Sequence, residues 1–86
     1  MLTNTFYDKD FTCLVAIGTG QRLKDCKHYV YCEISYKSGG LFYNQAFDAK
    51  YYDTVLHVYG MITKGLIPES EIVQTIRNIR KLHRAS

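Results

Sequence analysis

The sequence predicts an α+β fold, in which a three- to four-stranded antiparallel sheet is followed by two C-terminal helices packed on one face. Apolar residues alternate with a period of two in the first half of the chain and recur with a period of 3.6 after residue 48. Strand patterns grouped before helix patterns are typical of α+β folds. A chain of 86 residues is expected to form a single compact domain, residues 1–86.

The first full strand is predicted over residues 11–17, FTCLVAI. One face of it carries Phe11, Cys13, Val15 and Ile17, and the other carries Leu14 and Ala16. Because both faces are apolar, this strand is expected inside the sheet or covered on both sides. The preceding segment, LTNTFY, could add an edge strand. Residues 18–27, GTGQRLKDCK, are predicted to form a polar loop that contains two glycines.

The next strand, residues 28–37, contains the stretch YVYCEISY. Its even-numbered positions form an apolar stripe: Val30, Cys32, Ile34 and Tyr36. Gly39 and Gly40 permit the positive φ angles of a two-residue hairpin turn. Such a turn would place Tyr36 opposite Tyr43 and Cys32 opposite Phe47. The face away from the apolar stripe would then carry Tyr29, Tyr31, Glu33, Lys37, Phe42, Asn44, Ala46 and Asp48.

Two helices are predicted after this hairpin. Asp48 is a plausible N-cap for the first, because its carboxylate can accept a hydrogen bond from a first-turn amide. Gly65 is expected to end that helix, and Pro68 is expected in the first turn of the second. The short connection favours helices that run roughly antiparallel. The predicted core contains Phe11, Cys13, Val15, Ile17, Val30, Cys32, Ile34, Phe47, Val55, Tyr59, Ile62, Ile72, Ile76 and Ile79.

The net charge of +3 is unevenly distributed. Residues 1–76 carry a net charge of −1, whereas the last ten residues contain four cations and no acid: Arg77, Arg80, Lys81 and Arg84. Arg77, Lys81 and Arg84 recur at spacings of four and three, so they would lie along one side of a helix and could line up with phosphates. Cations near a helix C-terminus are also favoured by the dipole alone. Nucleic-acid binding through these four residues is therefore the alternative function.

No recognisable constellation for catalysis or cofactor binding occurs in the sequence, so neither enzymatic activity nor a cofactor is expected. The segment GTGQRLK lacks the Gly-Lys-Ser/Thr ending of a P-loop and the third glycine of a dinucleotide-binding fingerprint. His57 has Asp53 one helical turn away, but on a polar face where a weak surface pair is the ordinary interpretation. No serine or cysteine accompanies the histidines in a recognisable nucleophile motif.

Four soft metal ligands could approach one another: Cys13, Cys26, Cys32 and His28. Their spacing matches none of the usual paired-ligand patterns of zinc sites. Cys32 also belongs to the apolar stripe, where a buried cysteine behaves as a small hydrophobe. No metal is expected, and whether these four side chains ever meet is left open at this point.

The predicted binding surface is the polar face of the hairpin, with Tyr29, Tyr31, Glu33, Lys37 and Phe42. Tyrosine is enriched in protein interfaces because it supplies a large contact area with few rotatable bonds. The same aromatics could stack on unpaired bases or could be there for ordinary strand packing. An open sheet edge could also pair with a partner strand, including that of a second copy in a homodimer. A protein partner is the leading expectation.

The chain is therefore expected to be a small non-catalytic protein-binding module. Its size and layout are similar to those of small phage or mobile-element proteins that inhibit host enzymes or defence systems, including anti-CRISPR proteins. That similarity implies an inhibitor that occupies a partner's surface. The sequence shows neither a membrane-spanning run nor a signal peptide, and its odd number of cysteines fits a reducing compartment. A cytoplasmic location is expected, in the host cell if the protein is phage-encoded.

Overall fold

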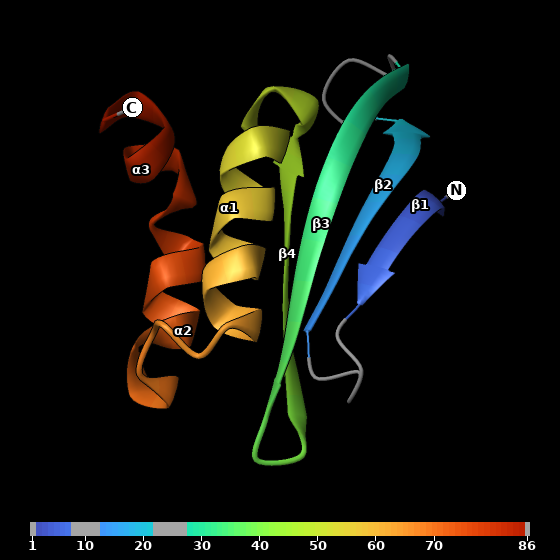
Figure 1. Cartoon of the computed structure of the whole chain (residues 1–86). Helices are drawn as coiled ribbons and strands as arrows, with labels where there is room; N and C mark the ends of the chain where they lie inside the picture. The colour runs from blue at the N-terminus through green and yellow to red at the C-terminus, as the bar shows by residue number, and fades with distance from the viewer. Residues whose placement is uncertain (1, 8–12, 22–27, 86) are drawn as a thin grey trace.

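The computed structural model describes residues 2–7, 13–21 and 28–85, and it confirms the α+β fold. Four strands form one antiparallel sheet in the order β1-β2-β3-β4. The strands are β1 (Leu2–Tyr7), β2 (Cys13–Gln21), β3 (His28–Ser38) and β4 (Leu41–Asp48). They are followed by the 3₁₀ turn η1 (Ala49–Tyr51) and the helices α1 (Tyr52–Thr63), α2 (Glu69–Arg77) and α3 (Ile79–Ala85). All three helices lie on the same face of the sheet (Figure 1).

The register of the β3–β4 hairpin is the predicted one. Tyr36 pairs with Tyr43, and Cys32 pairs with Phe47. Gly39 and Gly40 have φ angles of +58° and +85°, as a two-residue turn with two positive φ angles requires. The even-numbered side chains of β3 therefore face the helices, and the odd-numbered ones face the opposite side, which we call the outer face.

The prediction of a loop over residues 18–27 is wrong at its beginning, because β2 continues to Gln21. Gly18 and Gly20 lie within the strand, opposite Tyr31 and Tyr29. Glycine weakens a strand, partly because it offers no side chain to pack. Here the neighbouring strand β3 places a large tyrosine side chain opposite each glycine. The segment LTNTFY forms β1, an edge strand antiparallel to β2, whereas Phe11 lies outside the described residues.

The first helix ends as predicted, but it begins differently. Gly65 has a φ of +72°, and its N–H donates to the carbonyl of Ile62 at 3.1 Å while the N–H of Leu66 donates to that of Met61 at 2.9 Å. These two bonds are those of a Schellman motif. Asp48 does occupy the N-cap position of η1, but its side chain makes no capping hydrogen bond, so the predicted role of its carboxylate is wrong.

The second predicted helix is two helices, α2 and α3, separated at Asn78. Pro68 lies at the N-cap of α2, one residue before the predicted first turn. The backbone of Asn78 has φ −89° and ψ 5°, and its N–H donates to the carbonyls of Gln74 and Thr75. The side-chain amide of Gln74 also bonds the Asn78 side chain at 3.2 Å. This local turn divides the basic segment between two helices.

The core lies between the inner face of the sheet and the helices, and most of its predicted members are buried. Val30 is exposed, with 49% of its surface accessible, so its assignment to the core is wrong. The ladder between β3 and β4 begins one residue later, at Tyr31 and Asp48, so Val30 lies past the end of β4. Tyr51 and Val58 are buried although they were not predicted. Ile17, Tyr59 and Ile62 are half-buried.

No helix within the described residues combines the length and the apolar character needed to cross a membrane.

Candidate protein-binding surface

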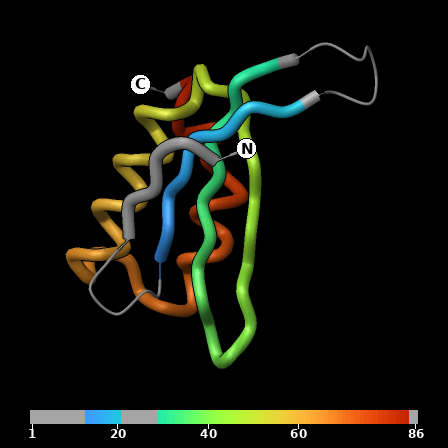
Figure 2. The backbone as a smooth tube through the Cα atoms, turned by 90° about the vertical axis from the view of Figure 1, so that its right-hand side faces the viewer, coloured from blue at the N-terminus to red at the C-terminus, as the bar shows by residue number. Residues whose placement is uncertain are grey.

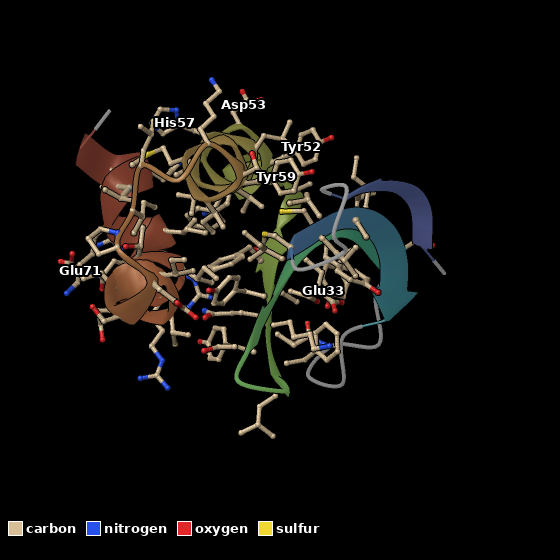
Figure 3. The ribbon with its side chains drawn as sticks, turned by 60° about the horizontal axis from the view of Figure 1, so that its bottom comes forward. Glu33, Tyr52, Asp53, His57, Tyr59 and Glu71 are labelled. Atoms are coloured by element: carbon tan, nitrogen blue, oxygen red, sulfur yellow. The ribbon has the colours of Figure 1, made fainter. Side chains whose placement is uncertain are left out.

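The outer face carries all five residues of the predicted binding surface. Tyr29, Tyr31, Glu33 and Lys37 are odd-numbered residues of β3, and Phe42 of β4 pairs directly with Lys37. Glu33 lies on the side of the sheet away from the helices (Figure 3). The register that places these side chains together was predicted, but their arrangement into separate clusters was not.

The first cluster consists of Tyr29 and Tyr31, which pack on β2. Their ring centroids are 5.6 Å apart and the rings are tilted by 39°. A Cβ atom built on Gly20 would lie 3.4 Å from the Cε1 atom of Tyr31 and 3.7 Å from that of Tyr29. Both rings therefore cover the glycine backbone, an arrangement known to support strand glycines. Both tyrosines are half-buried, so they contribute to packing as well as to the surface.

The second cluster lies at the hairpin end and is much more exposed. Phe42 has 60% of its surface exposed. The Nζ atom of Lys37 lies 5.9 Å from the centroid of the Phe42 ring, which is within the range of a cation–π contact. Tyr31 and Lys37 are six positions apart on β3, which is about 20 Å of extended strand. The candidate surface is therefore a long strip with an aromatic group at each end.

The middle of the strip carries polar side chains and small ones. Glu33 lies between two alanines, Ala16 on β2 and Ala46 on β4. The hydroxyl of Ser35 donates to the side-chain oxygen of Asn44 at 3.0 Å, which ties the two strands together across this face. Aromatic residues are enriched in protein interfaces, so the two ends of the strip are the parts best suited to contact with another protein.

The basic residues of the alternative function are divided into two pairs. The guanidinium of Arg77 lies 5.4 Å from the centroid of Tyr43, and its Nε donates to the Tyr43 hydroxyl at 3.4 Å. The guanidinium of Arg80 lies 5.5 Å from the ring of Phe47 and 6.0 Å from that of Tyr51. Both arginines are exposed, yet each is positioned by aromatic rings of β4 or η1. Sequence reasoning missed these contacts, since Arg77 and Tyr43, for example, are 34 positions apart in the chain.

The other pair, Lys81 and Arg84, is exposed on α3. The two residues are three positions apart, so they share a side of that helix. The break at Asn78 separates them from Arg77, which belongs to α2. The prediction that Arg77, Lys81 and Arg84 follow one side of a single helix is therefore wrong.

The candidate metal ligands are only partly described. Cys13 and Cys32 are buried thiols in the core, while Cys26 and the side chain of His28 lie outside the described residues. Burial raises the pKa of the Cys32 thiol, and the nearby Asp48 carboxylate adds to this. Its Sγ donates to the carbonyl of Asp48 at 3.8 Å. Among the described side chains, no group of three or more could hold a metal ion.

The two histidines whose side chains are described differ in their surroundings. His57 and Asp53 are exposed on α1 (Figure 3). His83 is half-buried, with its ring 4.8 Å from that of Tyr51 in an edge-on contact and its Nδ1 3.3 Å from the Thr54 hydroxyl. These contacts fasten α3 to η1 and α1.

None of the protein-family models, curated proteins or solved structures searched matches the chain, so the site is interpreted from its own geometry.

Proposed function

We propose that the chain is a non-catalytic module that binds another protein through the outer face of its sheet. The observation that carries the proposal is the exposure of an aromatic side chain, Phe42, on a face that no described helix covers (Figure 1). Phe42 has 60% of its surface exposed. Aromatic side chains are enriched at the energetically important positions of protein interfaces, and Phe42 shares its face with Tyr29 and Tyr31.

A partner that lies along the strip would contact both aromatic ends. Phe42 and Lys37 would supply an exposed anchor at the hairpin, and Tyr29 with Tyr31 would supply a preorganised one. Because the tyrosine rings are already held against Gly20, little side-chain entropy would be lost when they bind. A binder of this kind acts by occupying its partner's surface, as expected of a small inhibitor. We propose a cytoplasmic location for this activity.

The test is an affinity pull-down from a host lysate with mass spectrometry, in which the parent protein is compared with Phe42→Ala. Leu66→Ala is the matched control, because Leu66 has 66% of its surface exposed but lies in the connection between α1 and α2. We expect Phe42→Ala to lose a partner that the parent and Leu66→Ala retain. Equal recovery by all three proteins would contradict the proposal.

Tyr31→Phe is a useful second variant. It removes the hydroxyl but keeps the ring on Gly20, so the fold should be preserved while a hydrogen bond to the partner is lost. Tyr31→Ala is a poorer probe, because its loss of packing would reduce stability and binding together.

Nucleic-acid binding is the second candidate function. It is favoured by the exposure of Lys81 and Arg84 on a segment that contains no acid. Fluorescence anisotropy with a short single-stranded oligonucleotide tests it. Affinity should fall steeply as salt increases, and Lys81→Ala with Arg84→Ala should weaken it. The absence of binding at low salt would contradict this alternative.

A further inference from the structure

Strand β4 is the last strand in the order of the sheet and, within the described residues, pairs with β3 alone; Figure 2 shows it running up one side of the molecule from the hairpin turn. The two-residue turn makes Ser38 and Leu41 the first hydrogen-bonded pair of the hairpin, and such pairs then alternate along the ladder. Residues 41, 43, 45 and 47 therefore direct their N–H and C=O groups at β3. The intervening Phe42, Asn44 and Ala46 direct theirs to the open edge.

This edge lacks the features with which proteins usually prevent unwanted strand pairing. Exposed edges are commonly blocked by charged side chains, prolines or bulges. Residues 41–47, LFYNQAF, contain neither a charge nor a proline, and Asp48 at the end of β4 is the one charged residue of this strand. The β3–β4 register runs without a shift from the Tyr31–Asp48 pair to the Ser38–Leu41 pair. An edge of this kind is suited to accept a further strand.

Positive charge stands beside this edge on the helix side. Arg77 is placed over Tyr43 and Arg80 over Phe47, so the two guanidinium groups follow inward-facing residues of β4 that are four positions apart. Of the two acids of α2, Glu71 points away from the sheet (Figure 3), whereas the pKa of Tyr36 on β3 is raised by burial and by the charge of Glu69, at the start of this helix. A new strand would lie about 4.8 Å from β4, and its alternate side chains would project toward the same helices. Carboxylates at two such positions could bond the guanidinium groups.

A second copy of the chain fits this edge less well than an acidic segment does. Pairing of two β4 strands about a twofold axis would bring Arg77 and Arg80 of both copies to the same seam. Like charges brought together in this way oppose association. An acidic strand would instead neutralise them.

We propose that β4 binds an extended acidic segment of a partner protein by strand addition. Phe42, Asn44 and Ala46 supply the backbone hydrogen bonds. Arg77 and Arg80 select carboxylates at positions i and i+4 of the incoming strand. This inference concerns the edge of the sheet rather than its outer face, so it goes beyond the proposed function and does not depend on it.

The probe is a fluorescein-labelled peptide, TETVTETVT, whose two glutamates are four positions apart and share a face when the peptide is extended. The control peptide TKTVTKTVT replaces both glutamates with lysines. We expect the acidic peptide to bind the parent protein about tenfold or more tightly than the lysine peptide does. Equal affinities, or no binding of the acidic peptide at about millimolar concentration, would overturn the proposal.

Two pairs of variants test the two parts of the site. Asn44→Pro removes one outward N–H, whereas Asn44→Ala retains it, and circular dichroism would verify that both fold. Arg77→Gln with Arg80→Gln removes the same charge as Lys81→Gln with Arg84→Gln. We expect the first member of each pair to weaken acidic-peptide binding about tenfold, and the second to leave it nearly unchanged. Equal effects within either pair would overturn the proposal.

Amide hydrogen exchange measured by NMR identifies the occupant of the edge. The acidic peptide should slow exchange at Phe42, Asn44 and Ala46, which are unpaired in the free hairpin. No added protection at saturating peptide would overturn strand addition. Protection that instead grows with protein concentration in the absence of peptide would assign the edge to a second copy and would also overturn the proposal.

The two proposals can fail separately. Phe42→Ala retains its backbone amide and both arginines, so it should bind the acidic peptide as the parent does. Loss of the lysate partner with peptide binding intact supports the outer face as an independent surface. In the opposite case, Phe42→Ala retains the lysate partner while Asn44→Pro fails to bind the acidic peptide. That result supports strand addition at the edge and contradicts binding through the outer face.

Discussion

Replacement of Tyr31 by alanine should destabilise the fold, although the side chain lies on the face away from the helices. The ring packs on Gly20, with its Cε1 atom 3.4 Å from the place of a Cβ, and it contacts Tyr29 at a centroid distance of 5.6 Å. Truncation of a fully buried aromatic side chain costs about 3–5 kcal/mol. Since Tyr31 is half-buried, we expect Tyr31→Ala to lower the free energy of unfolding by about 2 kcal/mol.

Phe42→Ala is the matched comparison, because it removes an aromatic ring from the same face. With 60% of its surface exposed, Phe42 should contribute less than about 0.5 kcal/mol to stability. Urea unfolding followed by circular dichroism measures both values. In thermal unfolding, Tyr31→Ala should lower Tm by roughly 10 °C, since a domain of this size loses about 4–8 °C per kcal/mol.

A double-mutant cycle separates the contact between the tyrosines from their contact with β2. Tyr29→Ala, Tyr31→Ala and the double variant should yield a coupling free energy of about 0.5–1.5 kcal/mol. If Tyr31→Ala unfolds within about 0.5 kcal/mol of the parent, the ring does not pack on Gly20 and the reasoning is refuted.

Three further predictions concern the helices and the core. Arg80→Ala should cost about 1 kcal/mol because it loses ring contacts at 5.5 and 6.0 Å, whereas the adjacent, exposed Lys81→Ala should stay within about 0.5 kcal/mol of the parent; equal urea midpoints would contradict this. Gly65→Ala should lower the free energy of unfolding by about 1 kcal/mol, because the φ of +72° at this position is unfavourable for a residue with a Cβ. Gly60→Ala within α1, where a Cβ would meet nothing within 4 Å, should instead raise the free energy of unfolding by up to about 1 kcal/mol in the same assay. Because burial raises the pKa of the Cys32 thiol in the folded state, the contribution of this neutral thiol to stability is fully present below the ordinary thiol pKa of 9.0 and is lost as the pH rises above it. Urea unfolding at a series of pH values should show the free energy of unfolding falling in alkali, and a rise would contradict the assignment.

Local patterns predicted the sheet hairpin well and the ends of the helices less well. The register of β3 and β4 follows from period-two alternation and two adjacent glycines, which act over a few residues. The carboxylate of Asp48 was expected to cap a helix, but the chain enters η1 without that bond. The break at Asn78 was also missed, because the isoleucine stripe on either side continues through it.

The candidate surface was likewise predicted only in part. Alternation alone assigned Tyr29, Tyr31 and Phe42 to one face. It did not reveal that the tyrosines cover Gly20, because the preceding strand had been predicted to end before that glycine. The sequence also could not separate exposed Phe42 from the half-buried tyrosines, since burial depends on the neighbouring strand.

By itself, the sequence determined the class of fold, the hairpin register and the side of the sheet on which each β3 residue lies. These properties depend on residues that are neighbours in the chain, where periodicity and turn chemistry act directly. Only the tertiary structure decided that Arg77 and Arg80 belong to the β4 edge. The hydrogen bond from Arg77 to Tyr43 joins residues 34 positions apart. That contact forms because α2 packs over the last strand of the sheet, and no local pattern specifies which strand a helix will cover.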